Sequence, residues 1–195
     1  MRRTPRDAGA VRPEPAQRAS DVTVSSVVWE LDGRLLDVLH DLGVHFERVE
    51  AGAYVVHLHG RRRPSTLLWL LAGEQAVAVE AFVMHVVAVD DPGPLHRYLL
   101  ARNLRLRDVH FSVDDVGDVF LTGSLPHAAV DPDGVDRLLG EVLQLLEETQ
   151  DALVRTAYGD RLDDDPALAH KVHADGAGRR PAGTPAAAPR RDVRR

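Results

Sequence analysis

Two apolar runs in the middle of the chain constrain its fold more than any other feature. Residues 66–72 are almost wholly apolar, and Gly73-Glu74 separates them from a second run at residues 75–84. Runs of this length are typical of strands that are covered on both faces. The turn residues between them predict an antiparallel pair, which we place in the middle of a sheet.

The segment before this pair predicts one helix and two further strands. Apolar residues recur at three- and four-residue spacing up to Leu42, and Gly43 suits a left-handed C-cap, so a helix is expected to end there. The period then changes to two. We expect short strands at residues 44–49 and 54–58, joined by a turn at Ala51-Gly52.

A second helix and a hairpin are expected after the central pair. Asp91 can act as the N-cap of the helix, Pro92 suits its first position, and Asn103 tolerates the αL conformation of a C-cap. Alternating apolar residues at 109–113 and 119–122 then predict two strands joined by a turn.

The last element is the longest predicted helix. It begins at Asp131-Pro132, again a capping residue followed by proline, and apolar residues keep a helical period to Leu153. The predicted order is therefore α-β-β-β-β-α-β-β-α. Helices are separated from strands instead of alternating with them, which indicates the α+β class with an antiparallel sheet.

Composition predicts one folded domain, at residues 25–159. Residues 1–22 and 160–195 lack apolar periodicity and are rich in Pro, Ala and Arg, as in disordered segments. The part between residues 21 and 159 holds 11 of the 24 basic and 22 of the 30 acidic residues, a net charge of −11. This charge argues against nucleic acid as a specific ligand of the domain. The basic flanking segments leave a nucleic-acid-binding regulator open as an alternative.

Signals for secretion, membrane insertion and common catalytic motifs are absent from the sequence. The first residues contain no apolar core of a signal peptide, and no apolar run is long enough to span a bilayer, so a cytoplasmic protein is expected. No cysteine is present, and no Gly-Lys pair exists for a phosphate-binding loop. His57 and His59 share a strand face but lack a third predictable ligand, so we expect no metal and no cofactor.

Glu80 is the one charged residue inside the second apolar run. A partner arginine would make it structural, and we favour that interpretation over a catalytic carboxylate. An enzyme or small-ligand site centred on Glu80 remains the alternative. Because no other motif assembles a mechanism, we expect a protein that is not an enzyme.

Several segments together resemble the YbjN-domain family of high-GC bacteria. They are Glu80-Ala-Phe-Val, the run from His96 to Asn103 with its Tyr-Leu-Leu, the run from Val109 to Asp114, the run from Gly117 to Pro126, and the run from Val135 to Gly140. The resemblance covers residues 35–153. The fold of this family is similar to that of type III secretion chaperones.

The resemblance implies a non-catalytic, chaperone-like or adaptor domain that binds a protein and is often a homodimer. The residues that match the family pattern are Glu80, Tyr98, Asn103, Asp114, Gly117, Asp118, Gly123, Asp136 and Gly140. The contact with a partner or a second copy is expected on a face of the sheet or on the second helix. The candidate residues on that helix are Leu95, Tyr98, Leu99 and Arg102. The sequence does not identify the partner.

Overall fold

The computed structural model describes residues 26–86, 89 and 91–159. Its elements are α1 (Ser26–Asp41), β1 (Phe46–Glu50), β2 (Ala53–Leu58), β3 (Thr66–Ala72), β4 (Ala76–Met84), α2 (Gly93–Asn103), β5 (Val109–Val113), β6 (Val119–Pro126), the short 3-10 helix η1 (His127–Ala129) and α3 (Pro132–Tyr158). This order confirms the predicted α+β arrangement. The segments 1–22 and 160–195, predicted to be disordered, lie outside the described residues.

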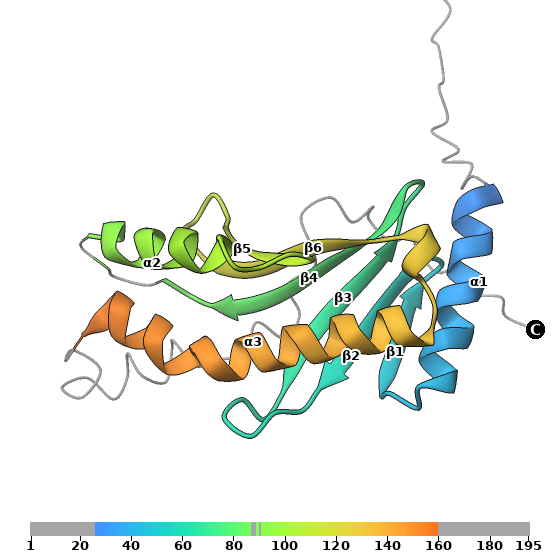
Figure 1. Ribbon diagram of the computed structural model, residues 1–195, viewed down its shortest axis with the longest axis horizontal. Coiled ribbons are helices and arrows are strands. Elements are labelled where there is room, and N and C mark those ends of the chain that lie inside the picture. The colour runs from blue at the N-terminus through green and yellow to red at the C-terminus, as the bar shows by residue number, and fades with distance from the viewer. Residues whose placement is uncertain (1–25, 87–88, 90, 160–195) are drawn as a thin grey trace, which may run out of the picture.

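The six strands form one antiparallel sheet in the order β1-β2-β3-β4-β6-β5 (Figure 1). The two apolar runs are β3 and β4, and they occupy the two central positions as predicted. Consecutive strands pair throughout, except that β6 lies between β4 and β5. The helix α2 carries the chain from β4 to the outer edge, where β5 begins, and β6 then returns beside β4.

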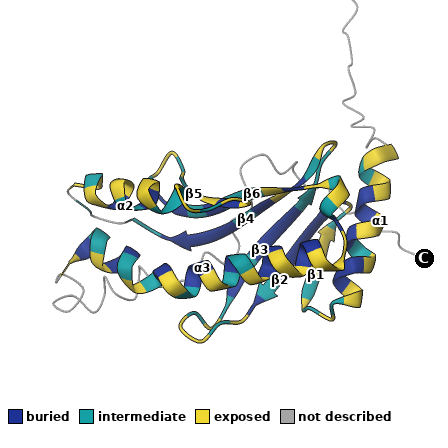
Figure 2. Ribbon diagram, viewed as in Figure 1, coloured by how far each residue is buried: buried dark blue, intermediate teal, exposed yellow. Residues whose placement is uncertain are grey.

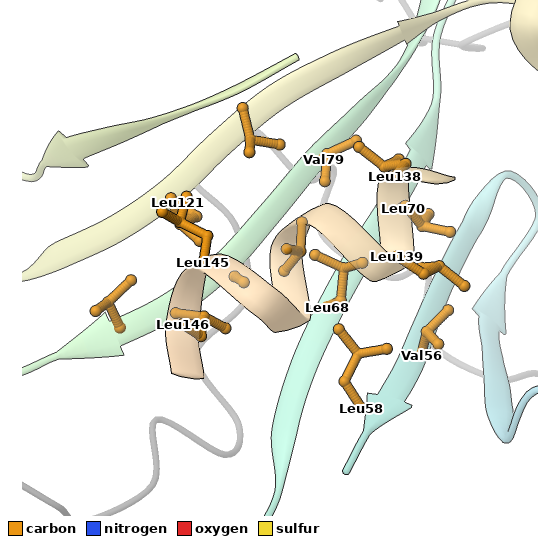
Figure 3. Packing of buried hydrophobic residues seen from close by; sticks show 14 of the residues in the cluster. Val56, Leu58, Leu68, Leu70, Val79, Leu121, Leu138, Leu139, Leu145 and Leu146 are labelled. Carbon is orange, nitrogen blue, oxygen red and sulfur yellow. The ribbon is translucent and has the colours of Figure 1, made fainter. Parts of the chain in front are cut away.

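All three helices contribute to one core on a single face of the sheet. Figure 3 shows α3 lying across the strands, with Leu138, Leu139, Leu145 and Leu146 directed at the sheet. The strand residues below them alternate along each strand, as the pleat requires, and include Val56, Leu58, Leu68, Leu70, Val79 and Leu121. Figure 2 shows the corresponding alternation of buried and exposed positions along α3. The sequence predicted that both faces of the central strands are covered. The described helices cover one of these faces.

The ends of two helices follow the predicted capping chemistry. The Asp131 side chain accepts a hydrogen bond of 2.7 Å from the Gly134 backbone N–H, and Pro132 takes the first position of α3. Gly43 follows α1 with a φ of 63°, which is the left-handed conformation expected there.

The prediction for the ends of α2 is wrong at both. Pro92 itself is the N-cap, and Asp91 accepts a hydrogen bond of 2.9 Å from the Gly93 N–H, so the helix begins one residue later than expected. Asn103 is the last residue of the helix and is therefore not in the αL conformation, and the C-cap residue Leu104 is right-handed as well, with a φ of −59°. The side chain of Asn103 has another role, described below.

Candidate protein-interaction face

The side of the sheet opposite the helices carries a second set of mostly apolar side chains, which we call the open face. Since neighbouring residues of a strand point to opposite faces, its members are the residues that alternate with the core positions. The apolar members and their central neighbours on the open face are Val55, Leu67, Trp69, Leu71, Ala78, Glu80, Phe82, Phe120 and Thr122. Around them the pairing also places the polar residues Glu47, His57, His110, Ser112 and Ser124 on this face. None of these residues belongs to the core cluster that the helices share with the sheet.

Trp69 lies at the centre of the open face. It is paired across the strands with Val55 on β2 and with Glu80 on β4. Trp69 is 9% exposed and Val55 is 6% exposed, whereas Leu67 and Leu71 on either side of the tryptophan are half-buried. The largest apolar side chain of the sheet thus lies on the face that no described helix covers.

Aromatic rings continue the open face toward the end of β4. The rings of Phe82 and Phe120 meet edge to face with centroids 5.5 Å apart. The His85 ring, just beyond the strand, lies 4.6 Å from that of Phe82. The open face therefore runs as an apolar strip from Val55 on β2 to Phe120 on β6.

Glu80 is the charged residue that the two central strands place on this face. Burial raises the pKa of its carboxyl above the ordinary value, and the nearby charge of Asp114 raises it further. Among the described residues no arginine forms an ion pair with Glu80, so the structural interpretation of this residue stays a prediction. Two surface hollows of the described residues, one beside Arg34 and His127 and one beside Gly60, are lined by other side chains. Glu80 is therefore a half-buried carboxylate of raised pKa among mostly apolar neighbours.

The residues of the turn between β5 and β6 hold the far end of this face in place. Asp114 accepts hydrogen bonds from the N–H groups of Val116 and Asp118, at 3.0 and 2.9 Å, and Gly117 has a φ of 92° that favours glycine. The buried Asp118 carboxylate contacts His85 Nδ1 at 2.8 Å and accepts from the Val86 N–H at 3.2 Å. Asp114 and Gly117 thus shape the turn, and Asp118 fastens the residues after β4 to the hairpin.

Asn103 closes part of one sheet edge. Its side-chain nitrogen donates to the Phe111 carbonyl at 3.0 Å, and its side-chain oxygen accepts from the Phe111 N–H at 2.8 Å. The strand β5 is an edge of the sheet, and these two groups face away from β6. Free backbone N–H and C=O groups at a sheet edge can pair with a strand of another chain. Asn103 occupies these groups at Phe111, in the middle of the edge strand β5, and so disfavours such pairing.

The remaining residues predicted from the family pattern divide into explained and unexplained positions. At Gly123 a Cβ atom would lie 2.3 Å from the Asp108 carbonyl oxygen, so only glycine fits beside the start of β5. Asp136 and Gly140 are exposed on α3, and no contact in the structure explains them.

Leu95 and Leu99 do not belong to a partner surface, contrary to the prediction. They are 1% and 3% exposed, because α2 packs its apolar stripe against α3 and β5. Tyr98 is half-buried beside them, and Arg102 lies 3.6 Å from Glu148 of α3. The apolar stripe of Leu95 and Leu99, predicted to be a contact surface, is part of the core.

A buried polar cluster at the other end of the molecule was missed by the sequence analysis. The Asp32 carboxylate, on α1, accepts hydrogen bonds from the Tyr54 hydroxyl, from the Gly52 N–H at 2.9 Å and from the Arg48 guanidinium. Burial, followed by the hydrogen bond to Asp32, raises the pKa of Tyr54. The one signal for it in the sequence was an acidic residue at a core-facing position of the helix. Helical periodicity alone does not show which residues donate hydrogen bonds to that acid.

The two histidines considered as metal ligands, His57 and His59, have different surroundings in the structure. His57 is half-buried and lies 3.5 Å from the Glu47 carboxylate and 4.5 Å, ring to ring, from His45, whereas His59 is exposed beyond the strand. Among the described residues, no group of three or more His, Asp or Glu side chains is arranged to hold a metal ion. The described helices are also too short or too polar to cross a bilayer.

One antiparallel sheet with three helices on one side and an apolar open face on the other defines a two-layer α+β domain. Residues 32–155 match the YbjN family, which carries the description "Putative bacterial sensory transduction regulator". The chain belongs to this family, as the resemblance of its Tyr-Leu-Leu and Gly-Asp segments predicted.

Relatives with the same sequence pattern come from mycobacteria. The chain is 37% identical over 138 residues to an uncharacterized protein of Mycobacterium leprae, a match that covers 64% of this chain and 74% of that protein. It is 39% identical over 106 residues to an uncharacterized protein of Mycobacterium tuberculosis, covering 54% of this chain and 57% of the relative. The chain thus spans little more than half the length of the second relative.

A solved structure is similar to part of the chain. It is a chain from the crystal structure of the ExsC–ExsE complex, with 21% sequence identity and a TM-score of 0.49. The match covers 66% of this chain and 97% of the other. At this level the similarity concerns the arrangement of the fold only.

Proposed function

We propose that this protein is a non-catalytic, chaperone-like or adaptor domain that binds another protein through the open face and acts as a homodimer. The observation that carries the proposal is an apolar strip on a sheet face that no described helix covers, centred on Trp69. Trp69 itself is buried, and the accessible apolar surface of the strip comes from the half-buried Leu67, Leu71 and Phe120 around it. Apolar surface of this kind supports a protein interaction site, and tryptophan is among the residues most enriched in strongly contributing contacts.

The positions of the two sheet edges favour contact through the face. Asn103 occupies the backbone groups of Phe111 on β5, and the opposite edge strand β1 carries Glu47, Arg48 and Glu50. Charged and blocked edges disfavour the addition of a further strand. The family description, a regulator of sensory transduction, fits a domain that acts by holding another protein.

Site-specific photo-crosslinking in the source cell tests the proposal. A photoreactive residue at Leu71 lies on the open face, whereas one at Gln144 lies on the exposed side of α3 as a matched control. We expect protein adducts from position 71, lost with Trp69→Ala, and none from position 144. Light scattering should give the mass of two chains. A strict monomer without an adduct specific to position 71 would refute the proposal.

A further inference from the structure

The outer side of α2 carries apolar residues that belong neither to the core nor to the open face. Leu100 and Leu104 are 68% and 88% exposed, which makes them the two most exposed large apolar side chains of the described residues. Leu104 follows the helix but keeps a right-handed conformation, with φ −59° and ψ −19°, so it lies one turn beyond Leu100 on the same side. A surface helix ordinarily has one apolar side, and α2 already buries Leu95 and Leu99 on the other.

An arginine lies at each end of this exposed apolar pair. Arg97 precedes Leu100 by three residues, and Arg105 directly follows Leu104, where its backbone N–H still bonds to the Arg102 carbonyl at 3.0 Å. Helical spacing therefore places both arginines on the outer side of α2, where Figure 2 shows exposed positions. Among the described residues, neither Arg97 nor Arg105 has a side-chain ion pair or hydrogen bond. We call this surface the α2 face, and its residues are Arg97, Leu100, Ala101, Leu104 and Arg105.

The α2 face is basic although the domain is acidic. Residues 92–107 hold four of the 11 basic residues found between residues 21 and 159, and they contain no Asp or Glu. The same part of the chain, residues 21–159, has a net charge of −11. Arg102 is directed at α3, where it lies 3.6 Å from Glu148, so it does not contribute to the α2 face. The face therefore presents two apolar side chains between two positive charges, those of Arg97 and Arg105.

An amphipathic helix with acidic residues complements this arrangement. Leu100 and Leu104 form a ridge of the i, i+4 type, which packs into the groove of a facing helix, and the small side chain of Ala101 lets the two helices approach closely. Arg97 and Arg105 are eight residues apart, which corresponds to about 12 Å along the helix axis. Two carboxylates with the same separation on the facing helix can pair with both arginines.

Other occupants suit the α2 face less well. Two copies related by a two-fold axis through this face would bring the arginines of one copy toward those of the other, and like charges repel. An anionic membrane or a nucleic acid would attract the two arginines but would be repelled by the net charge of −11 around them. A single helix meets the face alone, because salt screens charges beyond about 8 Å at physiological ionic strength.

We propose that the α2 face binds an acidic amphipathic helix of a partner protein. The helix α2 packs against α3 in the layer of helices, so this surface lies on the other side of the sheet from the open face (Figure 1). The inference does not rest on the proposed function of the open face. Because the two surfaces lie on opposite sides of the sheet, both can be occupied at once, and a domain that uses both joins two proteins.

Fluorescence anisotropy with the full chain and a designed peptide tests the inference. The probe is a labelled, alanine-based helical peptide of about 20 residues, with two leucines four residues apart and two glutamates eight residues apart on one side. We expect Arg97→Glu combined with Arg105→Glu to weaken binding about tenfold. Leu100→Ser combined with Leu104→Ser should weaken it about 100-fold. A peptide with lysines in place of its glutamates should bind the Arg97→Glu, Arg105→Glu variant as tightly as the parent chain binds the glutamate peptide.

A matched control separates a defined contact from general charge effects. Arg61→Glu combined with Arg155→Glu changes the net charge by the same amount at exposed arginines elsewhere in the domain. This control should leave the affinity for the glutamate peptide unchanged. Circular dichroism should show that all variants remain folded, since every substituted side chain is exposed.

The outcomes that overturn the inference are distinct from failure of the proposed function. Equal affinity of the parent chain and the Arg97→Glu, Arg105→Glu variant for the glutamate peptide would overturn it. A mass halved by Leu100→Ser with Leu104→Ser in light scattering would assign the face to a second copy. Binding to phosphatidylcholine–phosphatidylglycerol vesicles or to a DNA duplex that is lost with the arginines would assign it to a membrane or a nucleic acid. The crosslink at Leu71 reports on the open face alone, so either proposal can fail without the other.

Discussion

Replacing Asp32 by alanine should destabilise the domain more than any other single change at a polar residue of α1. The Asp32 carboxylate joins this helix to the first hairpin, because its hydrogen-bond donors come from Arg48 on β1, Gly52 in the turn and Tyr54 on β2. Asp32 itself is 4% exposed. The substitution therefore removes three contacts at once, two of them buried and one, with Arg48, at the edge of the site.

The magnitude follows from what each donor loses. The Gly52 N–H is buried and is left without an acceptor, at a cost of about 1–3 kcal/mol. The Tyr54 hydroxyl keeps the Asp32 backbone carbonyl at 3.1 Å, so it contributes about 1 kcal/mol. The Arg48 side chain is 40% exposed and regains water, so it adds little. The sum is about 2–4 kcal/mol, from a total stability of about 5–15 kcal/mol for a domain.

Urea denaturation of the full chain, followed by circular dichroism, measures this loss. With a slope of about 2 kcal/mol per molar, the midpoint should fall by about 1–2 M. Asp37→Ala, an exposed acid on the same helix, is the matched control and should change the midpoint little. Tyr54→Phe combined with Asp32→Ala should cost less than the two changes added, because they share a contact. A loss below about 1 kcal/mol for Asp32→Ala, or an equal loss for Asp37→Ala, contradicts the reasoning.

Three further predictions concern the sheet edge, the open face and α2. Asn103→Ala should free the Phe111 backbone groups and increase concentration-dependent association, which sedimentation velocity detects; unchanged sedimentation would argue against an edge-blocking role. Glu80→Gln should raise the free energy of unfolding at neutral pH, because the raised pKa of Glu80 means that its charged form disfavours folding, and the gain should vanish in urea titrations as the pH falls below the ordinary value of 4.5. Leu95→Ala should cost about 2–5 kcal/mol by the same titration, whereas Leu100→Ala, 68% exposed on the same helix, should cost little; equal effects would contradict the packing of α2.

The order of the elements could be predicted from the sequence because the signals for it are local. The change of period after Gly43 separates α1 from the strands, and the Asp131-Pro132 pair marks the start of α3 within one residue. The central position of β3 and β4 also followed from their composition, since a nearly continuous apolar run suits a strand whose two faces are both shielded from water.

The roles of single residues depended on partners far away in the chain. The sequence indicated that Asn103 matters but assigned it to a helix end, because the Phe111 backbone that it holds is reached only after the chain turns back. Asp32 was missed for the same reason, since its partners lie 16 to 22 residues further on. Helical period likewise identified the stripe of Leu95 and Leu99, but it cannot tell a buried stripe from an exposed one.

The sequence by itself determined the α+β order of the elements and the two largely apolar central strands, because periodicity and turn chemistry act over a few neighbouring residues. Only the tertiary structure decided which face of those strands the helices cover. The same alternation places Leu68 under α3 and Trp69 on the open face, and no local signal distinguishes the two. The packing of all three helices on one side made that choice, and it left Trp69 and Glu80 on the face that we propose binds a partner.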